Sequence, residues 1–133
     1  MACVSDIHLG HRTNKATDIT RKLKAAFPDN EETGKLDIIF IAGDVFDSLL
    51  TLDDNPYIAE IDLWIGNLLR VCANRDIILR VLKGTPSHDW DQSKRFEVIQ
   101  SVTQVPCDLK YVDTLEVEYI DKLDINVLIS QMN

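Results

Sequence analysis

Three short apolar runs, each followed at once by acidic or imidazole side chains, limit what this chain can fold into. The runs cover residues 2–5, 36–42 and 76–83, and the clusters that follow them begin at Asp6, Gly43 and Gly84. Continuous apolar runs are typical of parallel strands that are buried on both faces. Open α/β sheets carry their chemistry at the carboxyl ends of such strands. The pattern therefore predicts a layered α/β fold with a mostly parallel or mixed sheet.

Apolar side chains also recur at helical spacing between these runs. They predict helices at residues 15–27, 57–73 and 93–101, with Ser93 as the cap of the third helix. Trp64 belongs to the apolar stripe of the second helix, so we expect it in the core. Strands that alternate with helices imply a sheet with right-handed crossovers.

The remaining segments have weaker patterns. We expect a polar turn over residues 29–35, one strand or a hairpin within residues 108–119, and a last strand over residues 124–130. Neither a repeat nor a linker is evident, so we interpret residues 1–133 as a single domain.

Composition narrows the classes of protein that fit. The chain has no run of about 18 apolar residues and no basic segment before an apolar stretch at its start, so we expect neither a membrane span nor a signal peptide. Cys3, Cys72 and Cys107 are odd in number and widely spaced, which indicates reduced, buried thiols of a cytoplasmic protein. The net charge of −8 argues against capture of DNA by the whole surface.

The first two clusters have the residue types of a metal site. Asp6 and His8 stand two positions apart, and in extended chain such positions face the same side. Gly43 permits a turn that directs Asp44 back over the sheet edge. Carboxylate oxygens and imidazole nitrogens together suit manganese, iron or zinc. The alternative is that Asp6 caps a turn, that His8 is an exposed loop residue, and that Gly43 and Asp44 form a turn with a helix cap.

The third cluster is the segment Gly84-Thr85-Pro86-Ser87-His88-Asp89. Asp89 would orient the imidazole of His88 and favour its charged form. The alternative is a solvated turn with a surface ion pair, which contributes little.

Residues near the clusters allow two interpretations each. His11 and Arg12 contact a phosphate or are solvated, and Trp90 stacks on a base or packs its own loop. We expect Lys94 and Arg95 on a solvated helix face.

Together the clusters resemble the calcineurin-like metallophosphoesterases. That family has the motifs D-x-H, G-D-x-x-D and G-N-H-D, then a late His and a late G-H-x-H. The first two are present at residues 6–8 and 43–47, the third is altered, and the last two are missing. The segment Ser5-Asp6-Ile7-His8-Leu9-Gly10 and the Ser-His-Asp form of the third motif look most like the nuclease subunit of SbcCD-type DNA repair complexes, including its viral versions.

The resemblance implies a role for each matching residue. Asp6 and His8 would bind the first of two divalent metal ions, by resemblance Mn²⁺, and Asp44 would bridge both ions. Asp47 would support these ligands by hydrogen bonding. Two ions about 3.5–4 Å apart would clamp a phosphate during in-line hydrolysis.

The altered third motif changes the predicted binding site of the second metal ion. Ser87 stands where the family has a metal-binding Asn, and a hydroxyl is a poorer ligand than an amide carbonyl. We therefore expect this site to be weaker, bound through water, or completed by another residue. His88, supported by Asp89, would stabilise charge on the scissile phosphate or protonate the leaving oxygen. His11 and Arg12 are candidates for substrate binding.

Only three histidines occur, at positions 8, 11 and 88, whereas the family takes further imidazoles from its second half. The chain is accordingly expected to be a fragment, the product of a split gene or a degenerate member. The expected fold is the N-terminal, incomplete half of a metallophosphoesterase sandwich.

The function implied by the resemblance is manganese-dependent hydrolysis of DNA phosphodiesters, as an exonuclease or endonuclease in recombination or repair. An SbcC-like ATPase would be the partner, and complete relatives are expected to be homodimers. The location would be the cytoplasm, that of the host for a viral protein. Two alternatives stay open, a phosphoesterase acting on small phosphodiesters or phosphoproteins, and a non-catalytic interaction module.

Overall fold

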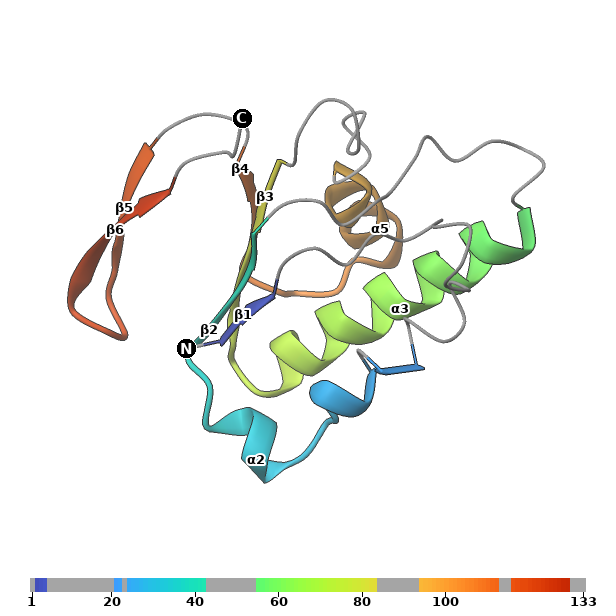
Figure 1. Ribbon diagram of the computed structural model, residues 1–133, viewed down its shortest axis with the longest axis horizontal. Helices are drawn as coiled ribbons and strands as arrows, with labels where there is room; N and C mark the ends of the chain where they lie inside the picture. Colours follow the sequence, from blue (N-terminus) through green and yellow to red (C-terminus); the bar gives the residue numbers. More distant parts are fainter. Residues whose placement is uncertain are drawn as a thin grey trace.

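The computed structural model has three layers, namely helices, a four-stranded sheet and a two-stranded hairpin (Figure 1). The structure describes residues 2–4, 21–22, 24–42, 55–83, 94–112 and 116–129. The predicted layered α/β class is confirmed at this level.

The central sheet consists of four parallel strands in the order β1-β2-β3-β4. They are β1 (Ala2–Val4), β2 (Ile38–Ala42), β3 (Ile78–Leu82) and β4 (Leu109–Val112). The first three coincide with the apolar runs, which confirms the predicted parallel strands, and β2 and β3 are buried as expected, whereas β1 is only partly buried. Each connection leads from one strand to its neighbour in the sheet. The order of the four strands in the sheet is therefore the same as their order in the sequence.

Both faces of the central strands are buried. In β2, Ile39 and Ile41 belong to a core cluster on the helix side, whereas Ile38 and Phe40 belong to a second cluster on the hairpin side. Because successive side chains of a strand point to opposite faces, a strand covered on both sides has few positions left for polar residues. This explains the continuous apolar run.

Helices α3 (Asn55–Asn74) and α5 (Arg95–Thr103) cover one face of the sheet (Figure 1). α3 confirms the predicted helix at 57–73 and begins two residues earlier. α5 confirms the predicted helix at 93–101, displaced by two residues. No described helix is both long and apolar enough to cross a membrane.

The ends of two predicted helices lie partly outside the described residues. Residues 21–22 and 24–26 are helical, which agrees with the described part of the predicted helix at 15–27. Ser93, the predicted cap of α5, is not described. The N-cap position of α5 is Lys94, whose side chain makes no capping hydrogen bond.

The prediction of a plain polar turn over residues 29–35 is wrong, because this segment contains the short helix α2 (Glu31–Gly34). Asn30 caps the helix: its Oδ1 accepts a hydrogen bond from the backbone N–H of Thr33 at 3.1 Å. Asn is among the preferred N-cap residues, and Glu31 and Glu32 favour the positive end of the helix dipole. The helix is too short for a 3.6-residue pattern to be visible.

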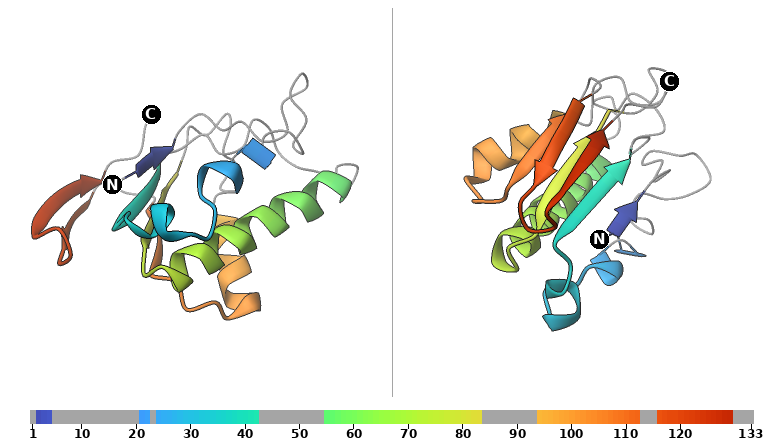
Figure 2. Two further views of the ribbon diagram at one scale, coloured as in Figure 1. Left: turned by 90° about the horizontal axis from the view of Figure 1, so that it is seen from below. Right: turned by 90° about the vertical axis from the view of Figure 1, so that its left-hand side faces the viewer.

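The opposite face of the sheet is covered by the antiparallel hairpin of β5 (Glu116–Ile120) and β6 (Ile125–Ile129) (Figures 1 and 2). β6 confirms the predicted last strand. The prediction of one strand or one hairpin within residues 108–119 is wrong, because β4 pairs with β3 and β5 pairs with β6. The segment thus contributes strands to two different sheets.

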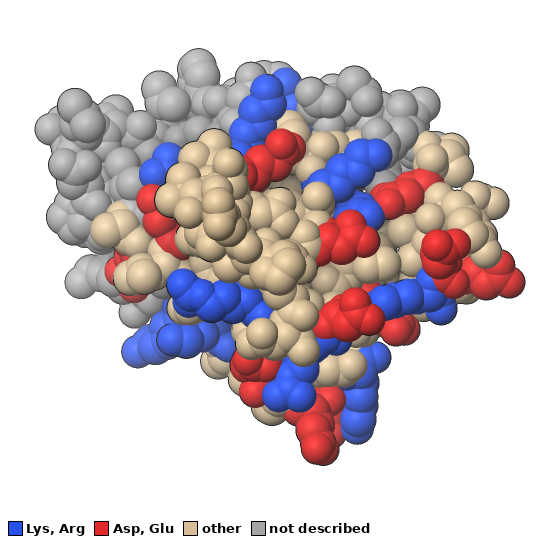
Figure 3. Space-filling model, turned by 180° about the vertical axis from the view of Figure 1, so that it is seen from behind, with Lys and Arg blue, Asp and Glu red and all other residues tan. Residues whose placement is uncertain are grey.

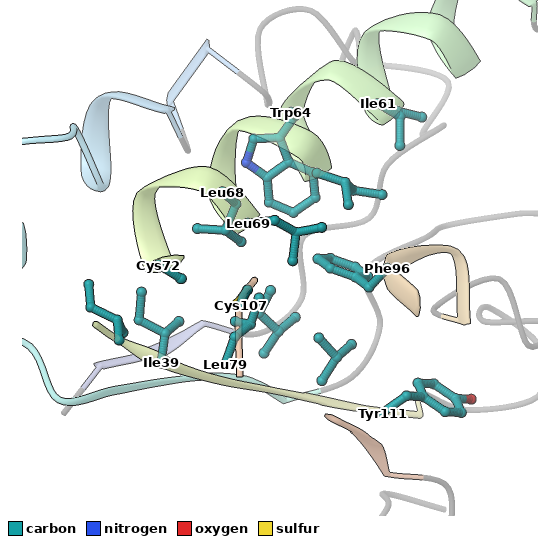
Figure 4. Close-up of a cluster of buried hydrophobic side chains, with 14 residues drawn as sticks. Ile39, Ile61, Trp64, Leu68, Leu69, Cys72, Leu79, Phe96, Cys107 and Tyr111 are labelled. Atoms are coloured by element: carbon teal, nitrogen blue, oxygen red, sulfur yellow. The ribbon is translucent and has the colours of Figure 1, made fainter. Parts of the chain in front are cut away.

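The larger core cluster lies between the helices and the sheet (Figure 4). Trp64 of α3 is 6% exposed and packs edge-on against Phe96 of α5, with ring centroids 5.8 Å apart and an interplanar angle of 83°. Such an arrangement adds about 1 kcal/mol beyond the burial of the rings. The prediction that Trp64 is a core residue is confirmed.

Two of the three cysteines are buried in this cluster. Cys72 and Cys107 are buried free thiols, as predicted, whereas Cys3 is exposed. A hydrogen bond with Cys107, together with burial, raises the pKa of the Cys72 thiol. The prediction of buried thiols is therefore correct for two positions and wrong for Cys3.

A buried ion pair joins the hairpin to the central sheet. Arg80 of β3 is 5% exposed, and its Nε and Nη2 donate to the two carboxylate oxygens of Glu118 on β5 at 2.7 and 2.6 Å. Its Nη1 donates to the backbone carbonyl of Asp108 at 2.8 Å and to the carboxylate of Asp108 at 3.1 Å. A buried charge needs such partners, because removal of one leaves an uncompensated ion in the interior.

Replacement of Glu118 by Gln is expected to destabilise the fold, because Arg80 would keep its buried charge and lose the less exposed of its two carboxylate partners. We expect the free energy of unfolding to fall by about 3 kcal/mol, measured by urea denaturation at pH 7. Asp121→Asn, in the exposed turn of the same hairpin, is the control and should change it by less than about 0.5 kcal/mol. Equal stability of Glu118→Gln and the parent would contradict the structural role of the pair.

The same ion pair predicts a loss of stability in acid. The hydrogen bonds from Arg80 hold the pKa of Glu118 below its ordinary value of 4.5. A carboxylate with a lower pKa in the folded state stabilises the fold above the unfolded-state pKa, and this stabilisation is lost as the pH falls through the folded-state pKa. Urea denaturation between pH 7 and about 3 should show that, below pH 4.5, the free energy of unfolding falls more steeply for the parent than for Glu118→Gln. Parallel pH profiles would refute this expectation.

Candidate functional site

The carboxyl ends of the parallel strands lie at one edge of the central sheet. Val4, Ile41, Val81 and Tyr111 form a continuous row of paired residues across the four strands. β1 ends at this row, and the other three strands continue for one further residue. The chain therefore leaves β1, β2 and β3 at neighbouring points of the same edge.

These three strands are the ones that precede the sequence clusters. β1 ends two residues before Asp6, β2 ends two residues before Asp44, and β3 ends five residues before Ser87. The common edge agrees with the expectation from the strand pattern. The structure thus brings together the points at which the three clusters begin.

The side chains of the clusters themselves lie outside the described residues, and their roles stay predictions. This holds for the predicted metal ligands, their support, the catalytic pair and the candidate substrate contacts. The residues concerned are Asp6, His8, His11, Arg12, Asp44, Asp47, Ser87, His88, Asp89 and Trp90.

The strands that lead to this edge are firmly anchored. Ile39, Ile41, Leu79 and Val81 are each at most 1% exposed and pack against the helices. The backbone N–H of Lys83 donates to the carbonyl of Val112 at 2.9 Å, so pairing with β4 continues to the last residue before Gly84. A site built on buried strands is held more precisely than one built on loops alone.

Arg95 is positioned differently from the prediction. It was expected on a solvated helix face, but its guanidinium is half-buried and pairs with both carboxylate oxygens of Asp62 on α3. This hydrogen bonding raises the pKa of Arg95. Lys94 is exposed, as predicted.

The pair between Arg95 and Asp62 fixes the start of α5 on α3. Arg95 follows Asp89 by six residues, so the pair holds the chain soon after the third cluster. The two residues are 33 positions apart, and no local sequence pattern links them. The periodicity of a helical face therefore could not predict this contact.

Within the described ranges, no group of three or more His, Cys, Asp or Glu side chains is arranged to hold a metal ion. The carboxylates of Asp108 and Glu118 are close together, but both are engaged by the guanidinium of Arg80. The metal ligands predicted in the sequence clusters stay a prediction.

No protein-family model matches this chain, and no curated protein matches it. The resemblance to the metallophosphoesterases accordingly depends on the motifs in the sequence and on their places after β1, β2 and β3.

Proposed function

We propose that this protein is a metal-dependent phosphodiesterase with a metallophosphoesterase-type fold, and most specifically a DNA nuclease subunit of the SbcCD type. The observation that carries the proposal is the common sheet edge from which all three clusters begin. A D-x-H or a G-D-x-x-D motif alone arises often by chance. Three such clusters that follow neighbouring, paired strands in order are much less expected by chance.

Chain length supports the convergence of the ligands. One residue advances the backbone by at most about 3.6 Å, so the Cα atom of Asp6 lies within about 7 Å of that of Val4. The same limit holds between Asp44 and Ala42. Neighbouring strands are about 4.8 Å apart, so the carboxylates that follow β1 and β2 could approach a shared cation.

The donor set fits divalent cations. Asp6, His8 and Asp44 offer carboxylate oxygens and imidazole nitrogen, which suit Mn²⁺, and Asp44 has two oxygens with which to contact two ions. Asp47 would orient these ligands, and Ser87 would complete the second site weakly. When bound, the cations supply Lewis acidity and lower the pKa of a coordinated water.

The chain's own residues would handle the phosphate. His88 would donate a hydrogen bond or proton to an oxygen of the scissile phosphodiester, and Asp89 would keep its imidazole oriented and charged. His11 and Arg12 would contact other phosphate oxygens as cationic or hydrogen-bonding groups.

We further propose DNA as the substrate, an SbcC-like ATPase as the partner, a homodimeric assembly and a cytoplasmic location. The net charge of −8 and the interspersed acidic and basic side chains on the face shown in Figure 3 favour capture of DNA with the help of a partner.

One sequence observation favours a second candidate function, that of a non-catalytic interaction module. The chain has only three histidines, and Ser87 replaces the expected amide ligand. A phosphoesterase acting on small phosphodiesters or phosphoproteins is the third candidate. It differs from the nuclease in substrate preference alone.

Manganese-dependent cleavage of labelled DNA tests the proposed function. We expect cleavage by the parent chain and a loss of at least about 100-fold in both His88→Ala and Asp44→Ala. Asp121→Ala, at an exposed turn of the hairpin, is the matched control and should retain activity. Preference for bis-p-nitrophenyl phosphate over DNA would select the small-substrate alternative. No cleavage of either substrate by the parent would contradict catalysis by this chain.

The predicted weakness of the second metal site can be tested separately from activity. We expect Mn²⁺ titration, followed by electron paramagnetic resonance of the free ion, to show one tight and one weak site. Ser87→Asn should tighten the weak site at least about tenfold, because an amide carbonyl is a better ligand than a hydroxyl. Ser101→Asn, on the exposed face of α5, should change neither site. A parent with two equally tight sites would refute the assigned role of Ser87.

A further inference from the structure

A groove runs along α3 on the side that faces residues 21–29. It consists of two adjoining hollows of about 230 and 440 Å³, which share Lys24, Trp64 and Asn67 in their walls. The residues that α3 contributes recur every three or four positions, so they form one stripe of the helix. They are Glu60, Leu63, Trp64, Asn67, Leu68, Arg70, Val71 and Asn74.

The length of the groove matches a secondary-structure element rather than a small molecule. From Glu60 to Asn74 the helix rises by about 21 Å. A partner helix of about 14 residues would have the same length. Helices that bind in grooves present apolar anchors at positions i, i+3, i+4 and i+7, and a helix of this kind could lie along the stripe on α3.

The floor of the groove is apolar. Trp64 and Leu68 lie at the boundary between the groove and the core, so each shows only a small part of its surface to the groove. Phe27 and Val71 are half-buried and form the opposite walls. Leu63, at the rim, is 65% exposed. An apolar side chain placed in this groove would therefore find apolar contacts on both walls.

Two basic residues flank this floor. Lys24 and Arg70 are both exposed and stand on opposite walls of the smaller hollow. Within the described part of the chain, no hydrogen bond or ion pair is made by the ammonium of Lys24. One nitrogen of Arg70 donates to Asn67 at 3.0 Å, which leaves most of its five N–H donors for a ligand.

The acidic residue in the same hollow is already compensated. Asp29 accepts hydrogen bonds from Asn74 at 2.9 Å and from Arg75 at 2.7 Å, and these bonds lower its pKa. At the far end of the groove, Arg21 and Glu60 carry opposite charges and both have polar partners. The smaller hollow thus keeps a local excess of positive charge on a chain whose net charge is −8.

We propose that this groove binds an acidic amphipathic helix of a protein partner. Its apolar side chains would pack on Phe27, Trp64 and Val71, and its carboxylates would pair with Lys24 and Arg70. Nucleic acid fits less well, because a phosphate backbone offers no apolar side chains to this floor and the chain as a whole is acidic. The groove contains none of the predicted metal ligands, so this proposal does not depend on the proposed catalytic function.

Fluorescence of Trp64 provides a direct test. The chain has two tryptophans, and Trp90→Phe in the full 133-residue chain leaves Trp64 as the reporter. The probes are two synthetic 15-residue amphipathic helices with the same leucine stripe, one with flanking glutamates and one with lysines at those positions. We expect saturable binding of the glutamate peptide and at least tenfold weaker binding of the lysine peptide.

Charge reversal in the groove identifies the binding surface. Lys24→Glu and Arg70→Glu should each weaken binding of the glutamate peptide at least fivefold and tighten binding of the lysine peptide. Lys35→Glu is the matched control, because it changes the net charge equally at an exposed position outside the groove. Far-ultraviolet circular dichroism would verify that each variant is folded.

Three results would overturn the proposal. They are equal affinity for both peptides, no saturable binding of the glutamate peptide, and unchanged affinity in both groove variants. An effect of Lys35→Glu as large as those of the groove variants would show attraction by net charge alone, and would also overturn it.

Discussion

The fold depends on the burial of the central strands on both faces. β2 supplies alternate side chains to the core under the helices and to the core under the hairpin, with Ile39 and Ile38 each fully buried. Fully burying a side chain of this size contributes about 1.5–3 kcal/mol. Neither cover alone would bury both sets. The helix layer and the hairpin are therefore both required to exclude water from the side chains of β2 and β3.

A single charged residue complicates this arrangement. Arg80 lies on the hairpin face of β3, between the partly buried Ile78 and Leu82, where an apolar residue would be expected. Its charge is tolerated because Glu118 and Asp108 supply opposite charges and acceptors. An ion pair in such a place often adds less stability than apolar residues would, but it fixes which groups must meet. Here it fixes the position of β5 on the sheet.

The candidate site depends on the same frame. The strands that precede Asp6 and Asp44 in the chain are neighbours, and their pairing holds the carboxyl ends of β1 and β2 together. The pair between Asp62 and Arg95 holds the chain soon after the third cluster. These contacts lie outside the predicted site, yet they limit how the clusters can be arranged.

Much of the fold could be predicted from the sequence, because its elements have strong local patterns. The runs of β2 and β3 and the stripe of α3 identified the buried elements, including Trp64. The short helix α2 was missed because four residues carry no period, although Asn30 is a recognisable cap. The separation of β4 from β5 was missed because strand pairing is not a local property.

The same distinction between local patterns and long-range contacts applies to the candidate site and to the molecule as a whole. Local sequence patterns were sufficient to predict β2, β3, α3 and α5, the burial of the two central strands and the residue types that follow each strand, since all of these are encoded by neighbouring positions. Tertiary packing, in contrast, establishes that β1, β2 and β3 end at one edge, that Arg80 pairs with Glu118 and that Arg95 pairs with Asp62. Those contacts join residues more than 30 positions apart, and they form only because packing of the two cores brings distant segments together.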